Sequence, residues 1–272
     1  SRAGRHCALY EYDRRLKSVI LDSFFAFQYP YFLLAAIALM AILYSSVGHG
    51  GASGYLAAMA LWGLAPEEMR PAALVMNIVV TTWLLTRFQP YKLMPYRLFW
   101  PLVIASTPLA FVGGLVSIGA ESYRLMLGVV LVLAAVRMLM IPKATPATNE
   151  PALLTIVLVG GSLGFVSGLT GIGGGVFLSP ILLVFGWCSI RQSAAVAAGF
   201  ILLNSIAGLA GYVASDQSWP MGTGWLVMAA LAGCLVGGEL ASHRASPSTL
   251  QKLLAVVLIV AGCKMGYTAL WH

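Results

Sequence analysis

The sequence predicts an all-α protein that crosses a lipid bilayer repeatedly, and three observations support this. Hydrophobic residues make up 60% of the 272 residues and charged residues only 9%, whereas about a quarter of the residues in a soluble domain are charged. Apolar runs of about 17–25 residues, the length of a membrane-spanning helix, recur along the chain. These runs do not alternate with polar residues, so they favour helices over a membrane β-barrel. We expect about eight to ten membrane segments.

The predicted segments form two halves, 29–141 and 152–272, which follow a basic, amphipathic tail at 1–28. The linker at 142–151 has the composition of a loop. In the first half we expect apolar segments at 30–47, 52–64, 72–86, 98–118 and 123–141, with a polar break at 66–71. In the second half we expect them at 152–168, 176–186, 193–213, 222–241 and 249–270, with a break at 187–191.

An internal repeat relates the two halves. Gly48, Gly50 and Gly51 recur at a spacing of 123 residues as Gly171, Gly173 and Gly174. Near the end of each half, Arg137 and Lys264 occupy matching positions in similar apolar stretches. Duplicated halves are the usual plan of transporters.

Two layouts of the repeat are compatible with the sequence. If each glycine cluster is a kink within one crossing, each half crosses four times and both halves point the same way. If each cluster is the tip of a hairpin, the halves are inverted relative to each other. We favour inversion, because the segment after each cluster is too short to span a bilayer and inverted repeats with broken helices are common in transporters.

The glycine clusters interrupt apolar segments, where unwound backbone is tolerated only beside protein or a water-filled cavity. The chain re-enters a helix just after each cluster, so free N–H groups and the positive end of the helix dipole point into the break. Such a place binds anions. Close helix packing, which also uses small residues, is the alternative explanation.

The candidate substrate-binding residues are the glycines of both clusters and the polar side chains near them: Gly48, His49, Gly50, Gly51, Ser53, Asn77, Thr81, Thr170, Gly171, Gly173, Gly174, Gly175, Asn204 and Ser205. His49 matches Ile172 in the other half and has three readings: it binds the anion, it carries a proton, or it is purely structural. Arg137 and Lys264 are candidate charge partners.

Catalytic and cofactor signatures are missing from the sequence. It contains no His-Glu-x-x-His, no Gly-x-Ser-x-Gly and no Walker-type phosphate loop, and its four cysteines show no metal-ligand spacing. We therefore predict no enzyme activity, no metal and no cofactor. The net charge of +7 is concentrated in the tail and at segment ends, which suits lipid headgroups rather than nucleic acid.

Two stretches resemble a known family. GLTGIGGGVFLSPILLVFG (168–186), followed by AAVAAGFILLNSIAGLAGY (194–212), resembles the second-half signature of the TauE/SafE sulfite exporter family, also called the 4-toluene sulfonate uptake permeases. SVGHGGASGYLAAMALWGLAPEEMRPAALVMNIVVTTWLLTRF (46–88) resembles its first half, with His49 and Ala52 as departures from the family's glycine pattern. The resemblance covers about residues 30–270.

The resemblance implies secondary transport of sulfite, a sulfonate or a related sulfur anion across a bacterial inner membrane. The substrate would be a small anion. We expect its transport to be driven by a proton or sodium gradient, with that ion as the coupling partner, or by the gradient of the substrate itself. The alternatives are an anion channel and a membrane-embedded enzyme or assembly factor. The direction of transport and the oligomeric state do not follow from the sequence.

Overall fold

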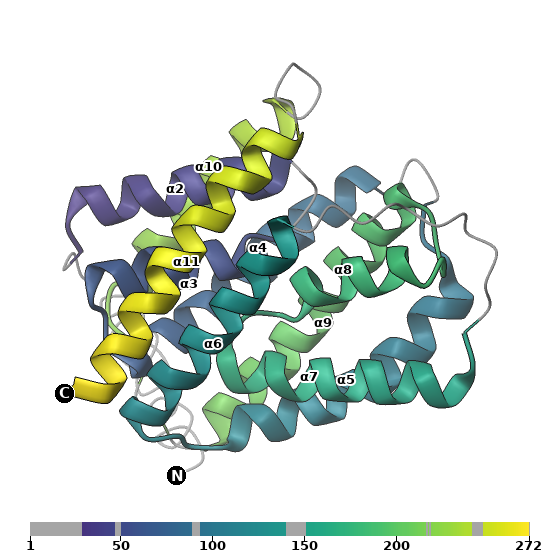
Figure 1. Cartoon of the computed structure of the whole chain (residues 1–272), viewed down its shortest axis with the longest axis horizontal. Coiled ribbons are helices and arrows are strands. Elements are labelled where there is room, and N and C mark those ends of the chain that lie inside the picture. The colour runs from purple at the N-terminus through teal and green to yellow at the C-terminus, as the bar shows by residue number, and fades with distance from the viewer. Residues whose placement is uncertain are drawn as a thin grey trace, which may run out of the picture.

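The structure is a computed structural model that describes residues 29–46, 50–88, 93–139, 151–215, 217, 219–240 and 247–271. Within these residues the chain forms ten α-helices and no β-strand (Figure 1). The all-α fold predicted from the sequence is therefore confirmed. The helices are α2 (Tyr31–Ser46), α3 (Ala52–Trp62), α4 (Pro66–Phe88), α5 (Tyr96–Leu115), α6 (Ala120–Leu139), α7 (Leu153–Thr170), α8 (Gly175–Val184), α9 (Ile190–Ala214), α10 (Thr223–Leu240) and α11 (Pro247–Trp271).

Six of these helices are long and apolar enough to cross a membrane by themselves, namely α4, α5, α6, α7, α9 and the Lys252–Trp271 part of α11. The other four, α2, α3, α8 and α10, are apolar but shorter. The chain is thus a multi-pass membrane protein, and the exact number of crossings stays a prediction. The predicted tail at 1–28 and most of the predicted linker lie outside the described residues.

One sequence prediction is wrong: the stretch 66–71 is not a break but the start of α4. Proline is favoured in the first turn, where its missing N–H costs no hydrogen bond, and Glu67 and Glu68 suit the positive end of the helix dipole. Pro71 removes one N–H from the helix, which frees the Glu67 carbonyl. The hydroxyl of Tyr212 donates to that carbonyl (3.2 Å), so α4 begins earlier than the prolines suggest.

The repeat-equivalent helices α4 and α9 pack against each other. They run antiparallel, because residues further along α4 contact residues earlier in α9. The start of α4 lies by the end of α9, where the Arg70 guanidinium stacks on the Tyr212 ring. Further along, the Asn77 amide of α4 donates to the Ser205 hydroxyl of α9 (3.3 Å). This pairing places polar side chains of both halves in the middle of the fold.

Some outer helices of one half pack against helices of the other half. In the first half α5 packs on α7 of the second, and α10 of the second half packs on α2 of the first (Figure 1). Both pairs are parallel, and glycines allow the close approach. A methyl group at Gly164 would overlap the carbonyl oxygen of Ser106, and one at Gly233 would overlap that of Ala38.

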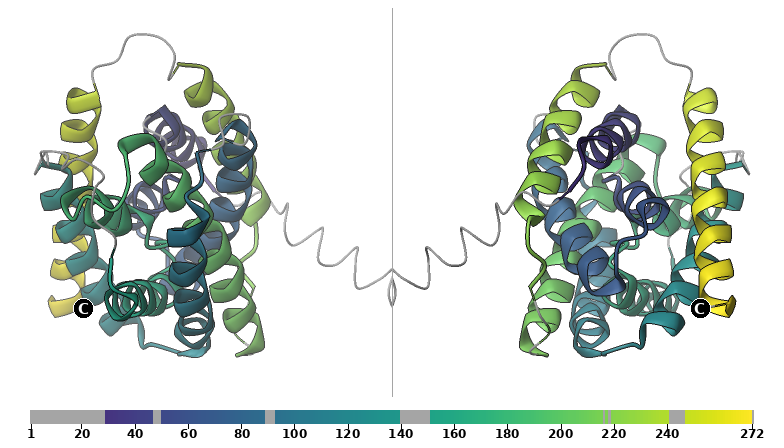
Figure 2. Two further views of the ribbon diagram at one scale, coloured as in Figure 1. Left: turned by 90° about the vertical axis from the view of Figure 1, so that its right-hand side faces the viewer. Right: turned by 90° about the vertical axis from the view of Figure 1, so that its left-hand side faces the viewer.

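The helices α6 and α11 pack against each other on one outer side of the molecule (Figures 1 and 2). Their apolar side chains, such as Leu133 and Val256, are exposed, as expected for a surface in contact with lipid. By contrast, α3 is buried along the whole run from Ala52 to Ala60. A helix that is buried all round, only 11 residues long, therefore lies inside the protein.

Candidate functional site

The second glycine cluster separates α7 from α8. The first helix ends at Thr170 and the next begins at Gly175. Three glycines between them adopt the left-handed backbone conformation: Gly171 (φ 83°), Gly173 (φ 80°) and Gly174 (φ 73°). Residues with a β-carbon rarely adopt this backbone conformation. We call residues 171–174 the second break.

The first glycine cluster precedes α3. Gly50 and Gly51 are described, and Gly51 is left-handed (φ 81°). Gly48 and His49 lie outside the described residues. We call residues 50–51 the first break. Neither Gly51 nor Gly174, the residues that precede α3 and α8, supplies a side-chain hydrogen bond to the start of its helix.

Both breaks meet at Ile201, a buried residue of α9. A methyl group at Gly50 would lie 3.2 Å from the Ile201 side chain and 2.7 Å from that of Thr81. One at Gly173 would lie 2.7 Å from Ile201, and one at Gly175 2.5 Å from it. The two clusters are 123 residues apart in sequence, yet the fold brings the beginnings of two short helices to one side chain.

The polar side chains predicted for the site are buried. Asn77 holds the second break, because its amide nitrogen donates to the Gly171 carbonyl (3.2 Å) as well as to Ser205. The hydroxyls of Thr81 and Thr170 donate to carbonyls of their own helices, those of Asn77 (2.6 Å) and Val166 (2.7 Å). Those two protons are therefore already used. The donors that remain for an anion include backbone N–H groups and the hydroxyls of Tyr55 and Ser167, which have no partner among the described residues.

The Ser53 hydroxyl lies 2.7 Å from that of Tyr44, within the first half. Asn204 donates from its amide nitrogen to the Phe200 carbonyl (2.9 Å). This bond orients its oxygen away from that carbonyl.

Several buried polar atoms near the breaks have no hydrogen-bond partner in the described structure. They include the Tyr55 hydroxyl, the amide oxygens of Asn77 and Asn204, and the Ser167 hydroxyl. The Tyr55 hydroxyl lies 2.6 Å from where a methyl group at Gly51 would be. An unsatisfied buried polar group costs about 1–3 kcal/mol, so water or a ligand is expected to satisfy such groups.

Sequence reasoning missed Arg70, which is 4% exposed. Its guanidinium donates to four backbone carbonyls, those of Gly168 (3.0 Å), Val116 (2.9 Å), Gly113 (2.5 Å) and Gly114 (2.8 Å). The backbone of Arg70 also borders the second break, since a methyl group at Gly171 would lie 3.0 Å from its carbonyl oxygen. The one available signal was a basic residue at the edge of an apolar run.

Tyr123 of α6 was also missed. Its hydroxyl donates to the carbonyl of Thr170 (2.8 Å), the last residue of α7. Together, Arg70, Asn77 and Tyr123 attach the second break and the end of α7 to α4 and α6.

The structure places the candidate charge partners at the ends of helices. The Lys264 ammonium donates to the Leu61 carbonyl (2.5 Å) in the last turn of α3. That carbonyl is ten residues along α3 from Gly51, or about 15 Å. Arg137 lies in the last turn of α6, which packs on α8 as α11 packs on α3.

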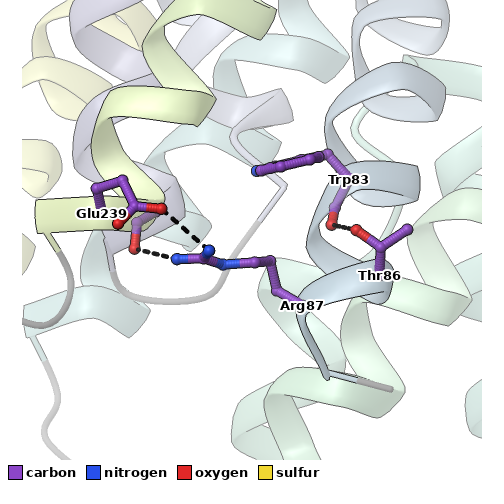
Figure 3. A network of polar contacts seen from close by, with 5 residues as sticks. Trp83, Thr86, Arg87 and Glu239 are labelled. Atoms are coloured by element: carbon purple, nitrogen blue, oxygen red, sulfur yellow. Dashed lines mark hydrogen bonds and ion pairs between the residues drawn. The ribbon is translucent and has the colours of Figure 1, made fainter. Parts of the chain in front are cut away.

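An exposed ion pair lies away from both breaks. Arg87, at the end of α4, pairs with Glu239 (3.0 Å) and donates to the Gly238 carbonyl (3.4 Å) of α10 (Figure 3). The Arg87 and Glu239 side chains are 45% and 72% exposed. Among the described residues, no cluster of three His, Cys, Asp or Glu side chains suits a metal ion.

Comparisons with known proteins identify the family of the chain. Residues 33–265 match the model of the family described as "Sulfite exporter TauE/SafE". The chain is 37% identical to the "Probable membrane transporter protein y4hK" of Sinorhizobium fredii over 86% of this chain and 96% of that protein. It is 23% identical to the "Probable membrane transporter protein YunE" of Bacillus subtilis, over 66% and 74% of the two chains. No solved structure matches the chain. The chain therefore belongs to the TauE/SafE sulfite exporter family of membrane transporters.

Proposed function

We propose that this protein is a secondary transporter that carries a small sulfur-containing oxyanion, such as sulfite or an organosulfonate, across the bacterial inner membrane. The anion binds between the first and second breaks, where backbone N–H groups at the beginnings of α3 and α8 donate to its oxygens. Family membership supports the transport of such an anion. Backbone donors and helix dipoles suit an oxyanion, which offers several acceptor oxygens.

The observation that carries the proposal is the convergence of both breaks on Ile201. A transport site at a repeat interface needs a broken helix from each half at the same place. The buried polar atoms without partners at Tyr55, Asn77 and Ser167 lie around this place, which supports a ligand or water there rather than dry packing.

The proposal includes inverted halves. Helices α4 and α9 are repeat-equivalent and antiparallel, so they cross a bilayer in opposite directions. A second glycine match supports the same arrangement: Gly113 and Gly114, near the end of α5, recur at a spacing of 124 residues as Gly237 and Gly238, near the end of α10. Arg70 binds the carbonyls of Gly113 and Gly114, whereas Arg87 binds that of Gly238. These two arginines are 17 residues apart on α4, or about 26 Å.

The proposal also includes a coupling ion, a proton or sodium. The amide oxygens of Asn77 and Asn204 are buried and unpartnered, and oxygen ligands of this kind suit a hard cation. This supports a sodium ion bound close to the substrate.

Flux measurements test the proposed function. Purified protein in proteoliposomes should transport radiolabelled sulfite or a labelled sulfonate, and Gly173→Val should abolish that flux. The matched control is Gly266→Ala, because a methyl group at Gly266 meets no other atom within 4 Å. Full flux through correctly folded Gly173→Val would reject the site.

A further inference from the structure

Arg70 brings a full positive charge into the interior of the fold beside the second break. Among the described residues all its polar partners are neutral: four backbone carbonyls and, at 5.6 Å from the guanidinium carbon, the ring of Tyr212. An arginine this deeply buried is usually paired with a carboxylate. The charge of Arg70 is therefore compensated by dipoles and not by an acid.

The carbonyls that Arg70 binds belong to two helix ends. Gly113 and Gly114 are in the last turn of α5, and Gly168 is in the last turn of α7. The C-terminal end of a helix carries about half a negative charge, because its last carbonyls have no partner within the helix. The two ends together therefore present about one negative charge, which the guanidinium neutralises.

The end of α7 faces the same break as the start of α8. An anion in the second break would be attracted by the positive start of α8 and repelled by the negative end of α7. With the end of α7 neutralised by Arg70, the attraction from α8 prevails. The position equivalent to Arg70 in the second half is Ser193, a neutral residue whose hydroxyl donates to the Ser179 carbonyl (3.3 Å). The described part of the first break therefore has no arginine equivalent to Arg70.

We propose that Arg70 is a specificity-determining residue of the anion site: by neutralising the ends of α5 and α7, it makes the second break prefer anions, and divalent over monovalent ones. This inference rests on the proposed function. Arg70 acts without touching the substrate, through the electrostatic potential at the break. Its bonds through all three guanidinium nitrogens also fix the positions of the two helix ends, which a lysine ammonium cannot reproduce.

The test compares two anions of similar shape and different charge, methanesulfonate and sulfate, for binding to the detergent-purified full chain by calorimetry. A charge about 10 Å away, at an effective dielectric constant of about 20, changes the affinity for a monovalent anion roughly tenfold and for a divalent anion by about the square of that factor. Arg70→Gln should therefore lower the preference for sulfate over methanesulfonate about tenfold. Arg70→Lys should preserve this preference, within about twofold, even where it lowers the melting temperature.

Arg87→Gln is the matched control, because it removes an arginine that also binds the end of a helix but is exposed and paired with Glu239. It should leave the preference unchanged. An unchanged preference in folded Arg70→Gln would overturn the inference and leave the proposed function standing. If Arg70→Gln does not fold, Arg70→Lys decides, because it retains the positive charge. A tenfold loss of the preference for sulfate over methanesulfonate in Arg70→Lys would also overturn the inference. Failure of the wild-type protein to bind either anion would instead reject the proposed function, and this inference with it.

Discussion

The two breaks have the same glycine pattern but are held in different ways. The second break is attached to helices distant in sequence, by Arg70, Asn77 and Tyr123. The described part of the first break is bordered by Tyr55 and Thr81 of its own half and by Ile201 of the other half. The two breaks share glycines at matching positions, but Gly173 is left-handed (φ 80°) whereas Gly50 is not, and the side chains around them differ. This difference teaches that matching glycines can be held by unlike contacts: the second break by hydrogen bonds to α4 and α6, the described part of the first by side-chain packing.

The largest expected effect is that of a substitution in the second break. Gly173→Ala forces a β-carbon into the left-handed conformation, at about 1–2 kcal/mol, and adds an overlap with Ile201 and Asn77. We expect at least about a tenfold loss of flux in proteoliposomes. Gly50→Ala should reduce flux less, about two- to fivefold, because the atoms that its methyl group meets are the ends of the Thr81 and Ile201 side chains.

Because both breaks contact Ile201, a second substitution at this residue tests the difference between them more sharply. Adding Ile201→Ala should restore part of the flux to Gly50→Ala and less to Gly173→Ala, where backbone strain remains. Equal losses in the two single variants, or equal rescue, would contradict the difference between the breaks.

A negative charge at the second break should weaken anion binding. Asn77→Asp is nearly isosteric, but its carboxylate would lie beside the Gly171 carbonyl and near the bound anion. At an effective dielectric constant of about 20, this repulsion should lower anion affinity at least about tenfold. Calorimetry with sulfate measures the change, and Asn77→Gln controls for side-chain size. Wild-type affinity in Asn77→Asp would place the anion elsewhere.

Replacing one tyrosine at each break should change the stability of the protein by different, smaller amounts. Tyr123→Phe leaves the Thr170 carbonyl without its donor, so it should lower the free energy of unfolding by about 1 kcal/mol. Tyr55→Phe removes a hydroxyl that has no hydrogen-bond partner among the described residues and should leave the stability of the ligand-free protein nearly unchanged. Thermal melts of both variants, with and without sulfate, measure this. A larger loss in Tyr55→Phe than in Tyr123→Phe would reverse the comparison.

The smallest effect concerns the loops that follow the short helices. Cys188, between α8 and α9, is buried, which raises the pKa of its thiol from 9.0 to about 11. Its equivalent, Ala65, is exposed. With the other cysteines replaced, Cys188 should react slowly with maleimide at neutral pH, and its reactivity should rise up to about pH 11.

A cysteine introduced at Ala65 should react faster in the same assay. Equal rates would show that the two loops are equally open. The pKa shift also predicts that burial of the Cys188 thiol stabilises the fold below pH 9.0 and that this contribution is lost as the pH rises towards 11.

Helix positions could be predicted from the sequence because apolar length and glycine interruptions are local signals. The predicted segment 152–168, for example, is α7, Leu153–Thr170. The start of α4 was missed, because prolines are compatible with a first helical turn and Tyr212 satisfies the carbonyl that Pro71 frees. The contact with Tyr212 depends on the three-dimensional fold and cannot be read from the local sequence.

The glycines and Asn77 of the site could also be predicted, since they lie at repeat-matched or neighbouring positions. Arg70 could not, because its partners are 43 to 98 residues away in the sequence and nothing local links them. Lys264 matches Arg137 in sequence, but its ammonium binds the far end of α3 from the first break. A repeat match reveals equivalent positions, whereas only the fold reveals what those positions touch.

The most direct test of the anion site is a crystal structure of the protein grown with selenate, a heavier analogue of sulfate, using the anomalous signal of selenium. We predict a selenium peak beside Ile201, within hydrogen-bonding reach of the backbone at the start of α3 or α8. A peak only at a distant place, such as beside Lys264, or no peak in a protein shown to transport selenate, would contradict the account.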